Sequence, residues 1–477
     1  MSHPLRLPRT GLAASLLLLA ASGCDDAATP DPYASTSPSQ GTVGRLHDAE
    51  GRELLLRGVN ARVDGIFDVT FDDGRLPLEP IPPFTGEDCR FLAEELGLDH
   101  LRLPVNWSAI EPNKGDYRAD YVDRIVALAA DCEAHGVHTL VDLHQDAYSK
   151  EIGEDGAPYW AILPEPPMKL GGPLTDLGAR RMSQETLAAF ESFYDDAEGV
   201  QTAYAAMAAW LAKRIEGKPG VVGLELQNEP VLLFGADRLD SFNALVGGAV
   251  RRAAPTLTIF FEPNSTRNIS DMAPVTAPVP FRDAVYSPHI YVDVFETGWA
   301  SEDVGAIETS VARAVDEAAQ HSASLYVGEF GNGNDTRGLL YTTECERIFD
   351  ERFASWAFWV YEEWSQGSWG LYDMVDTGSG PSRGALRTAT ADVLARAYPV
   401  ATAGHVESFT YVPATKTLTV NLSRARANLD HVLAAPHRTY PNGVVVTCDG
   451  APVAATVAAG RANVRCGGSV LVMGPAD

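Results

Sequence analysis

The amino-acid sequence predicts an α/β protein: a TIM (β/α)8 barrel followed by a small C-terminal β-sandwich. Apolar, β-branched segments alternate with helical segments, which is typical of a parallel sheet. Polar residues follow most of the apolar segments, and TIM barrels carry their chemistry at that end of their strands. From about residue 404 the pattern changes to about seven short alternating segments separated by turn signals such as Tyr440-Pro-Asn-Gly443, which indicates a β-sandwich.

Composition limits the possible ligands. The chain has 477 residues, 45% of them hydrophobic and 21% charged, as in soluble globular proteins. Its 64 acidic and 37 basic residues give a net charge of −27. This charge argues against binding to nucleic acid or to an anionic membrane surface. It favours a neutral or cationic ligand, and we expect a monomer.

The N-terminus is predicted to be a targeting segment. Two arginines precede the apolar segment Leu12–Ala20, and small residues lead from it to Cys24. The apolar segment is too short to span a bilayer, and residues 1–24 resemble a bacterial lipoprotein signal in which Cys24 is lipidated. Ordinary signal-peptidase cleavage nearby is the alternative. Residues 25–41 are then a flexible tether, and we expect an exported protein that is lipid-anchored to the cell envelope or secreted.

The remaining cysteines suggest disulfides and no metal site. Cys448 and Cys466 both lie in the C-terminal β-rich region and are expected to pair. Cys89 and Cys132 lie in successive helical segments and could also pair, which leaves Cys345 unpaired. The sequence contains no CxxC motif or Cys/His cluster that indicates a metal.

Residues 42–400 are predicted to form the barrel and residues 401–477 the β-sandwich. Most of the eight strand candidates are continuous apolar runs, as expected for strands covered on both faces. These candidates are Leu54–Asn60, Leu98–Pro104, His138–Asp142, Val221–Gln227, Leu257–Glu262, Ala284–His289, Ser324–Gly328 and Ser355–Val360. The expected helices are Glu87–Leu96, Tyr117–His135, Gln201–Glu216, Leu239–Ala253, Glu302–Gln320, Leu340–Phe353 and Gly384–Ala397.

Three connections of the predicted barrel are unusual. The link between the fifth and sixth strands is short and proline-rich, so its helix should be reduced. Residues Ala61–Pro83 and Ala147–Gly199 form long loops after the first and third strands. Loops of this length inside a compact domain are usually lids or binding elements.

Two glutamates at strand ends indicate the chemistry. The fourth strand ends in Asn228-Glu229-Pro230, and Glu329 follows the seventh. Retaining glycosidases need two carboxyl groups about 5 Å apart, one ionised and one protonated. We therefore predict that Glu329 is the nucleophile and Glu229 the acid/base. Repulsion and partial burial should raise the pKa of Glu229 while donors keep Glu329 ionised. A salt bridge would explain either glutamate taken alone.

Five motifs at the strand ends make the chain similar to glycoside hydrolase family 5, the cellulase-like barrel family, over about residues 51–399. In order along the chain they are Arg57-Gly-Val-Asn60, Arg102-Leu-Pro104, Asn228-Glu-Pro230, His289-Ile-Tyr291 and Gly328-Glu-Phe-Gly331. Within the family, the segments Asp142–Asp146 and Trp359–Tyr361 and the added β-domain resemble the endoglycoceramidases. Those enzymes release the intact glycan from a glycosphingolipid.

The resemblance implies roles around the glutamate pair. Asn228 would bond the 2-hydroxyl of the sugar, and Arg102 and Tyr291 would donate to Glu329 and keep it ionised. The simpler alternative for Arg102 is an ion pair in the barrel core.

Further roles concern the sugar itself. The resemblance implies that His144 and His289 hydrogen-bond the site and the sugar, that Asp146 accepts from sugar hydroxyls, and that Trp359 stacks beneath the reacting ring. Either histidine could instead be a satisfied core residue, and Trp359 could serve packing only.

Other polar residues receive weaker interpretations. We expect Glu362 and Glu363 to line the pocket rim or face solvent, and His100 to be an ordinary helix-end or surface residue. The glycan-contacting lysine that endoglycoceramidases carry after the first strand has no counterpart before Lys114. The residues that could occupy its place are Arg62, Asp64 and Asp72.

The function predicted from the sequence is a retaining β-glycosidase with endoglycoceramidase-like activity on a carbohydrate or glycolipid substrate. Two carboxylates suffice for this reaction, so no metal or organic cofactor is expected. The alternatives are an endo-β-1,4-glucanase and, from another class, a surface lipoprotein that binds carbohydrate without catalysis.

Overall fold

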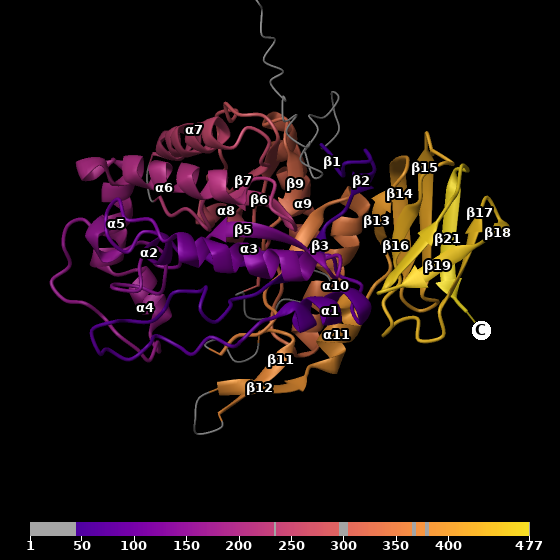
Figure 1. The fold of residues 1–477 in the computed structure, drawn as a ribbon, viewed down its shortest axis with the longest axis horizontal. Helices are drawn as coiled ribbons and strands as arrows, with labels where there is room; N and C mark the ends of the chain where they lie inside the picture. The colour runs from indigo at the N-terminus through magenta and orange to yellow at the C-terminus, as the bar shows by residue number, and fades with distance from the viewer. Residues whose placement is uncertain (1–43, 233–234, 295–303, 365–368, 377–380, 477) are drawn as a thin grey trace, which may run out of the picture.

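The computed structural model describes residues 44–232, 235–294, 304–364, 369–376 and 381–476. The predicted signal peptide, the tether and Cys24 lie outside the described residues. Two bodies are visible in Figure 1: an α/β body on the left and an antiparallel β-domain on the right. No helix of the described residues has the length and apolar character needed to cross a membrane.

Eight parallel strands close into a barrel in the order β10-β3-β4-β5-β6-β7-β8-β9, which confirms the predicted TIM barrel. Neighbouring strands pair in parallel register, for example Arg102 with Leu140 between β4 and β5. The strands are β3 (Arg57–Asn60), β4 (His100–Val105), β5 (His138–Leu143), β6 (Val221–Glu225), β7 (Ile259–Phe261), β8 (Ala284–Tyr286), β9 (Ser324–Val327) and β10 (Ser355–Phe358).

Helices surround the barrel on the outside (Figure 1). Their starts follow local capping chemistry: Thr85 and Asp88 form a capping box at α1, and the Asp335 side chain accepts from the backbone of Gly338 at α10. The helix between the fifth and sixth strands, α8, is reduced to six residues, in line with the sequence. The helices are α1 (Gly86–Glu94), α3 (Ala119–Glu133), α6 (Val200–Ile215), α7 (Ala236–Ala253), α8 (Ser265–Ser270), α9 (Val304–Gln320), α10 (Thr336–Arg352) and α11 (Thr388–Leu394).

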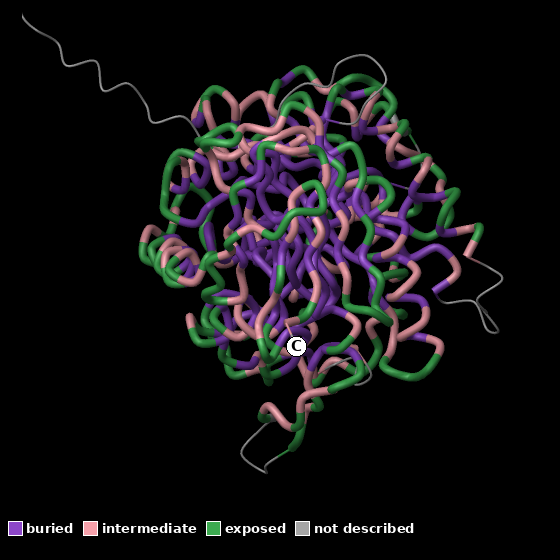
Figure 2. The backbone as a smooth tube through the Cα atoms, turned by 90° about the vertical axis from the view of Figure 1, so that its right-hand side faces the viewer, coloured by how far each residue is buried: buried purple, intermediate pink, exposed green. Residues whose placement is uncertain are grey.

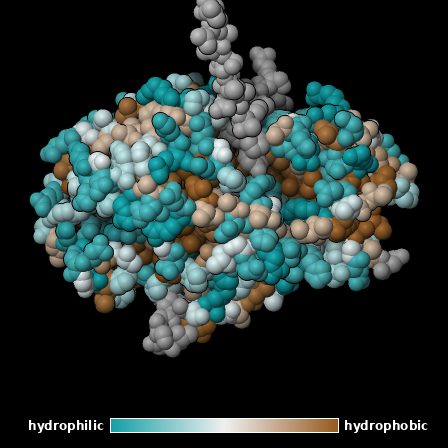
Figure 3. Space-filling view, viewed as in Figure 1, coloured by the Kyte–Doolittle hydropathy of each residue, from teal (hydrophilic) through white to brown (hydrophobic). Residues whose placement is uncertain are grey.

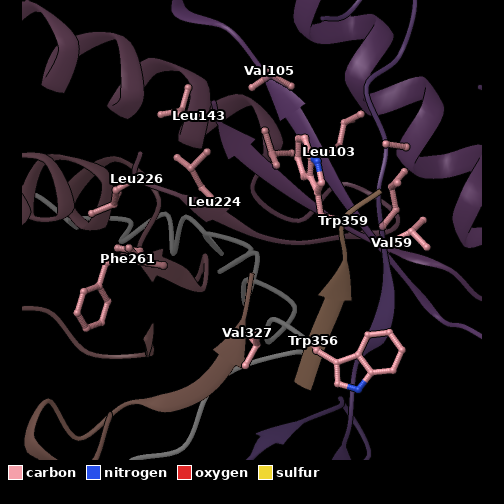
Figure 4. Packing of buried hydrophobic residues seen from close by; sticks show 14 of the residues in the cluster. Val59, Leu103, Val105, Leu143, Leu224, Leu226, Phe261, Val327, Trp356 and Trp359 are labelled. Carbon is pink, nitrogen blue, oxygen red and sulfur yellow. The ribbon is translucent and has the colours of Figure 1, made fainter. Parts of the chain in front are cut away.

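The barrel strands are buried on both faces (Figure 2). Outward-facing side chains pack under the helices, and Figure 4 shows examples from Val59 on β3 to Trp356 on β10. Inward-facing side chains such as Leu140 and Phe260 form a separate cluster with residues of the N-terminal segment. The barrel interior is therefore filled by side chains, as is usual for this fold.

His100 belongs to this interior, and its interpretation as an ordinary helix-end or surface residue is wrong. It opens β4, is fully buried, and its Nε2 lies 2.9 Å from the hydroxyl of Tyr326. Burial lowers its pKa to about 3, so the imidazole is neutral.

The C-terminal domain consists of two antiparallel sheets, which confirms the predicted β-sandwich. One sheet has the order β1-β2-β13-β16-β20-β19 and the other β14-β15-β21-β17-β18. Their strands are β1 (Leu46–His47), β2 (Glu53–Leu54), β13 (Pro399–Thr402), β14 (His405–Val412), β15 (Thr417–Ser423), β16 (His431–Ala434), β17 (Val444–Cys448), β18 (Ala451–Val453), β19 (Ala455–Ala458), β20 (Arg461–Val464) and β21 (Val470–Pro475).

The two domains share the N-terminal segment. The predicted first strand, Leu54–Asn60, divides into β2, which pairs with β13 of the sandwich, and β3, which pairs with β4 and β10 of the barrel. Strands β1 and β2 therefore belong to a sheet of the sandwich, although they precede the barrel in the sequence.

A hairpin replaces the first part of the expected helix Gly384–Ala397. Strands β11 (Tyr372–Asp376) and β12 (Pro381–Leu386) pair, and α11 begins only at Thr388. Proline and glycine are poor helix formers. In addition, the Arg383 side chain forms an ion pair of 2.6 Å with Glu362, which fixes the hairpin to the barrel.

The two long loops are ordered and contact each other. Backbone N–H groups of Gly172 and Leu174 donate to the carbonyls of Leu76 and Leu78 at 2.9 and 2.7 Å. Besides α3, β5 and α6, the elements between strands β4 and β6 are α2 (Trp107–Ile110), η1 (Tyr159–Ala161), α4 (Leu177–Arg181), α5 (Gln184–Tyr194) and η2 (Ala197–Gly199). The face seen in Figure 3 is mostly hydrophilic with scattered apolar side chains, which is normal for a protein surface.

The part of the chain that the structure describes contains two disulfides. One joins Cys89 of α1 to Cys132 of α3, and the other joins Cys448 to Cys466 within the β-sandwich. The thiol of Cys345 is buried and takes part in no disulfide.

Candidate active site

Arg102 lies at the centre of the barrel mouth and is fully buried. Its Nη1 donates to Glu329 Oε1 at 2.8 Å, and its Nη2 donates to Asn228 Oδ1 at 2.8 Å. The same guanidinium forms ion pairs with Asp142, Glu225 and Glu262 at 2.6 to 3.1 Å. Arg102 is therefore both a core ion-pair centre and a donor to Glu329, so its two interpretations hold together.

Glu229 and Glu329 lie close together. The set Glu229, His289 and Glu329 offers one oxygen or nitrogen atom each, and these atoms all lie within 4.8 Å of one another. This separation matches the roughly 5 Å that a retaining glycosidase requires and is too short for an inverting one. The hydroxyl of Tyr291 donates to Glu329 Oε2 at 2.9 Å, beside the bond from Arg102.

His289 distinguishes the two carboxylates. Its Nδ1 lies 3.0 Å from Glu229 Oε1 and 3.5 Å from Glu329 Oε2. Burial would raise the pKa of Glu229, but the hydrogen bond from His289 lowers it below its ordinary value. Burial raises the pKa of Glu329, although His289 and Arg102 oppose this.

These pKa directions are the reverse of the expected ones. The sequence predicted a raised pKa for Glu229 and an ionised Glu329 kept so by its donors. The physical reason for the difference is the imidazole, which faces Glu229 more closely. Burial lowers the pKa of His289, but the neighbouring carboxyl groups of Glu262, Glu329 and Glu229 together raise it by more. The ring therefore holds a proton next to Glu229 in the free enzyme.

The backbone of Glu229 is strained. Its φ is +41°, in the left-handed region that non-glycine residues rarely adopt. Its N–H donates to Glu262 Oε2 at 3.0 Å, and its carbonyl accepts from Gln145 Nε2 at 2.9 Å. Such strain persists only where the surroundings impose it, and it is common at functional sites.

His144, Asn228 and Trp359 form one wall of the site. The rings of His144 and Trp359 are parallel within 8°, with centroids 5.8 Å apart. His144 Nδ1 lies 2.6 Å from Asp142 Oδ2, and its Nε2 lies 3.4 Å from the amide nitrogen of Asn228. An indole face and an amide at this place suit a sugar ring and its hydroxyl groups.

Asp146 has a partner that the sequence did not reveal. Arg181, on the short helix α4 of the long loop after β5, donates from Nη2 to Asp146 Oδ1 at 2.7 Å. Burial would raise the pKa of Asp146, but the Arg181 charge lowers it to about 2. Arg181 itself is half-exposed at the mouth. No periodic pattern or motif marks it, because its place depends on how the loop folds back.

Arg62 occupies the space after the first strand. It is buried and forms ion pairs with Glu79, Glu154 and Glu363 at 2.5 to 3.3 Å. Of the two expectations for Glu363, exposure to solvent is excluded, and Glu362 is likewise buried against Arg383. These ion pairs tie the loops after β3, β5 and β10 together.

A cavity of about 830 Å³ lies between the two long loops. Asp64 and Asp72 line it, together with Lys150, whose Nζ is held by the carboxylate of Asp68 at 2.7 Å. Phe67 also lines it and lies with its ring 6.0 Å from that of His144, so the cavity adjoins the site wall.

Among the described residues, two groups of side chains have the spacing of cation ligands: Glu229 with His289 and Glu329, and His144 with Asp146 and Asp155. Asp146 is paired with Arg181 and His144 with Asp142. The first group consists of the catalytic candidates themselves. We therefore assign neither group as a metal centre.

The fold and this site define a class of protein: a barrel hydrolase that carries a close pair of glutamates at the C-terminal ends of its fourth and seventh strands. The chain belongs to glycosyl hydrolase family 5. The profile described as Cellulase (glycosyl hydrolase family 5) matches residues 52–365, and that of the Glycoside hydrolase family 5 C-terminal domain matches residues 396–466. This confirms the family predicted from the strand-end motifs and makes the protein a glycoside hydrolase.

Relatives extend over nearly the whole chain. Endoglycoceramidase I of Rhodococcus hoagii is 27% identical over 473 residues, which cover 91% of this chain and 87% of that protein. An endoglycoceramidase of Hydra vulgaris is 23% identical and covers 87% of this chain and 83% of its own. The crystal structure of an endogalactoceramidase superposes with a TM-score of 0.76 at 26% identity, covering 93% of this chain and all of that one.

Proposed function

We propose that the protein is a retaining β-glycosidase of the endoglycoceramidase type, which releases a glycan from a lipid aglycone. The observation that carries the retaining mechanism is the Glu229–Glu329 pair within 4.8 Å. Support for the glycolipid substrate comes from the similarity to endoglycoceramidases along more than nine-tenths of the chain.

In the first step, a Glu329 oxygen attacks the anomeric carbon while the bond to the aglycone oxygen breaks. Glu229 donates a proton to that oxygen, so the aglycone leaves as a neutral alcohol. The product is a glycosyl ester on Glu329. Arg102 and Tyr291 stabilise the carboxylate of Glu329 before it attacks. They also stabilise the same carboxylate when it leaves the sugar in the second step.

In the second step, the Glu229 carboxylate takes a proton from water as the water attacks the anomeric carbon and releases Glu329. His289 lies 3.0 Å from Glu229 and can share the proton taken from water until the next turnover. Asn228 is placed to bond the 2-hydroxyl, and Trp359 to lie beneath the sugar ring. His144 and Asp146 contribute to binding of the remaining hydroxyls.

The substrate is tested by incubating purified protein with a ganglioside and with carboxymethyl-cellulose side by side. The proposal predicts release of the intact glycan and of ceramide, detected by mass spectrometry. Hydrolysis of the polysaccharide alone would establish an endo-β-1,4-glucanase instead. Absence of turnover of any β-glycoside, with sugar binding retained, would favour a non-catalytic carbohydrate-binding lipoprotein.

We also propose that the protein is exported and anchored through a lipid on Cys24, as a monomer. Support comes from the sequence of residues 1–24. Cys24→Ala should then move the protein from the membrane fraction to the soluble fraction of a bacterial host. An unchanged distribution would contradict the anchor, and sedimentation of the soluble form would give the oligomeric state.

A further inference from the structure

Glu262 is a buried carboxylate at the barrel mouth that has no place in the reaction described above. It follows β7 directly and is 1% exposed. One of its oxygens accepts from the backbone N–H of Glu229 at 3.0 Å. The other lies 3.1 Å from Arg102 Nη2 and 3.2 Å from His289 Nε2. Glu262 thus contacts the acid/base itself and the basic partner of each catalytic glutamate.

The contact with His289 places a carboxyl group behind the imidazole. His289 Nε2 lies 3.2 Å from the Glu262 oxygen on this side of the ring. The opposite ring nitrogen, Nδ1, lies 3.0 Å from Glu229 Oε1. A negative charge on one side of an imidazole raises its affinity for a proton, which here is shared with Glu229.

The contact with the Glu229 backbone opposes strain. The φ of Glu229 is +41°, a conformation that persists only where the surroundings hold it. The hydrogen bond from the Glu229 N–H to the Glu262 carboxyl group is one of the contacts that hold it. The orientation of the Glu229 carboxyl group toward the glycosidic oxygen depends on this backbone conformation.

We propose that Glu262 is a positioning residue for acid/base catalysis: it keeps the proton that Glu229 delivers on the Glu229–His289 pair and holds the backbone of Glu229 in place. The proposal rests on the role of Glu229 as acid/base and not on the identity of the aglycone. Burial raises the pKa of Glu262 to about 8 although His289 and Arg102 oppose this, so its negative charge is fullest on the alkaline side, where the shared proton is lost. The titratable or charged groups that face it are Glu229, Arg102, Glu225, His289 and Tyr194.

The test compares leaving groups in a Glu262→Gln variant. A 2,4-dinitrophenyl β-glycoside departs without protonation, whereas an alkyl or 4-methoxyphenyl β-glycoside requires an acid. We expect kcat/KM of Glu262→Gln to fall about tenfold or more for the poor leaving group and about threefold or less for the activated one. The alkaline limb of kcat/KM should move to lower pH by about one unit, because a negative charge near the shared proton is lost.

Glu225→Gln is the matched control. Glu225 is also buried and bonds to Arg102 Nε at 2.6 Å, but its described hydrogen bonds and ion pairs do not include Glu229 or His289. Since Arg102 assists the nucleophile, Glu225→Gln should reduce kcat/KM by the same factor for both leaving groups. Its alkaline limb should move less than that of Glu262→Gln.

An equal loss of kcat/KM for both leaving groups in Glu262→Gln, with an unmoved alkaline limb, would overturn the proposal. Glu262 would then serve only to hold Arg102 in place or to stabilise the fold. Glu262→Asp provides a second measurement, because it keeps the charge and shortens the side chain. Its alkaline limb should stay at the wild-type pH although its activity falls, and a shift to lower pH there would also contradict the proposal. Failure to hydrolyse glycolipids would leave these aryl-glycoside comparisons unaffected.

Discussion

At the scale of single residues, the barrel mouth holds more carboxylates than cations. One guanidinium, that of Arg102, contacts Asp142, Glu225, Glu262 and Glu329. Buried carboxylates are costly unless they are paired or share protons. The charge of the site is therefore set by a network, and the pKa of the acid/base depends on its neighbours as much as on its own burial.

Removing the acid/base should reveal its role through leaving-group dependence. In Glu229→Ala we expect kcat/KM to fall by a factor of about 10²–10⁴ for a poor leaving group and far less for a dinitrophenyl glycoside. Azide should rescue the second step by attacking the glycosyl ester and giving a β-glycosyl azide. Glu329→Ala is the comparison, and a β-glycosyl azide from that variant would contradict the assigned roles.

His100 predicts an acid-sensitive fold. Its pKa is about 3 in the folded chain and 6.5 when unperturbed, so the unfolded state binds more protons between these values. The stability contributed by the neutral ring is present above pH 6.5 and is lost as the pH falls through this window. We expect His100→Gln to weaken the decrease of Tm between pH 7 and pH 4.5. The exposed His437→Gln is the control and should leave that slope unchanged.

Most residues of the site could be predicted because they directly follow apolar strands. The rest depend on tertiary placement: Arg181 comes from a helix inside a long loop, and Glu262 ends a strand whose importance only the barrel geometry shows. His100 was misjudged for the same reason, since a polar residue beside a strand end can point inward as easily as outward. Sequence spacing gives no sign of that direction.

At the scale of elements, the long loop after β5 brings a cation into the site. The loop carries α4 and α5, and Arg181 of α4 holds Asp146. Strand and helix patterns predicted the regular elements of the barrel. They could not predict the hairpin β11–β12, which tertiary ion pairs such as Arg383–Glu362 fix in place.

Arg181→Ala should therefore weaken substrate binding more than chemistry. The loss of the guanidinium frees Asp146, whose pKa should rise from about 2, and loosens the loop. We expect KM to rise several-fold with a smaller change in kcat. Arg313→Ala, which removes an exposed arginine of α9, is the control. A fall in kcat alone would assign Arg181 to the reaction itself.

The disulfide between α1 and α3 should stabilise the barrel. It closes a loop of 43 residues, for which the loss of chain entropy in the unfolded state is worth about 4 kcal/mol. Cys89→Ala/Cys132→Ala should lower Tm while leaving kcat/KM of the folded enzyme unchanged. The disulfide between Cys448 and Cys466 closes a loop of only 18 residues. The double variant Cys448→Ala/Cys466→Ala should therefore lose less stability. An equal decrease of Tm in the two double variants, or a larger decrease in the second, would show that local packing and not loop length determines the stabilisation.

At the scale of the whole molecule, the β-sandwich closes one end of the barrel. The strand β2 pairs with β13, and Leu54 and Ala401 join the inward-facing barrel side chains Leu140 and Tyr326 in one cluster. Arg396, at the start of the C-terminal domain, forms ion pairs with Glu346 and Asp350 of α10. The two domains therefore share a core.

Deleting residues 399–477 should accordingly unfold the barrel rather than release an active catalytic domain. The truncated chain would expose the apolar barrel end, so we expect an insoluble product or loss of the cooperative thermal transition. Circular dichroism of the soluble fraction measures this. A folded truncated chain with wild-type kcat/KM would contradict the shared core.

The most direct test of the account is the configuration of the first product. Proton NMR during hydrolysis of a β-glycoside, recorded before mutarotation, distinguishes the two anomers of the released sugar. The carboxylate pair within 4.8 Å predicts that the β-anomer forms first, through a glycosyl ester on Glu329. Initial appearance of the α-anomer would mean direct attack by water and would contradict the roles assigned to Glu229 and Glu329.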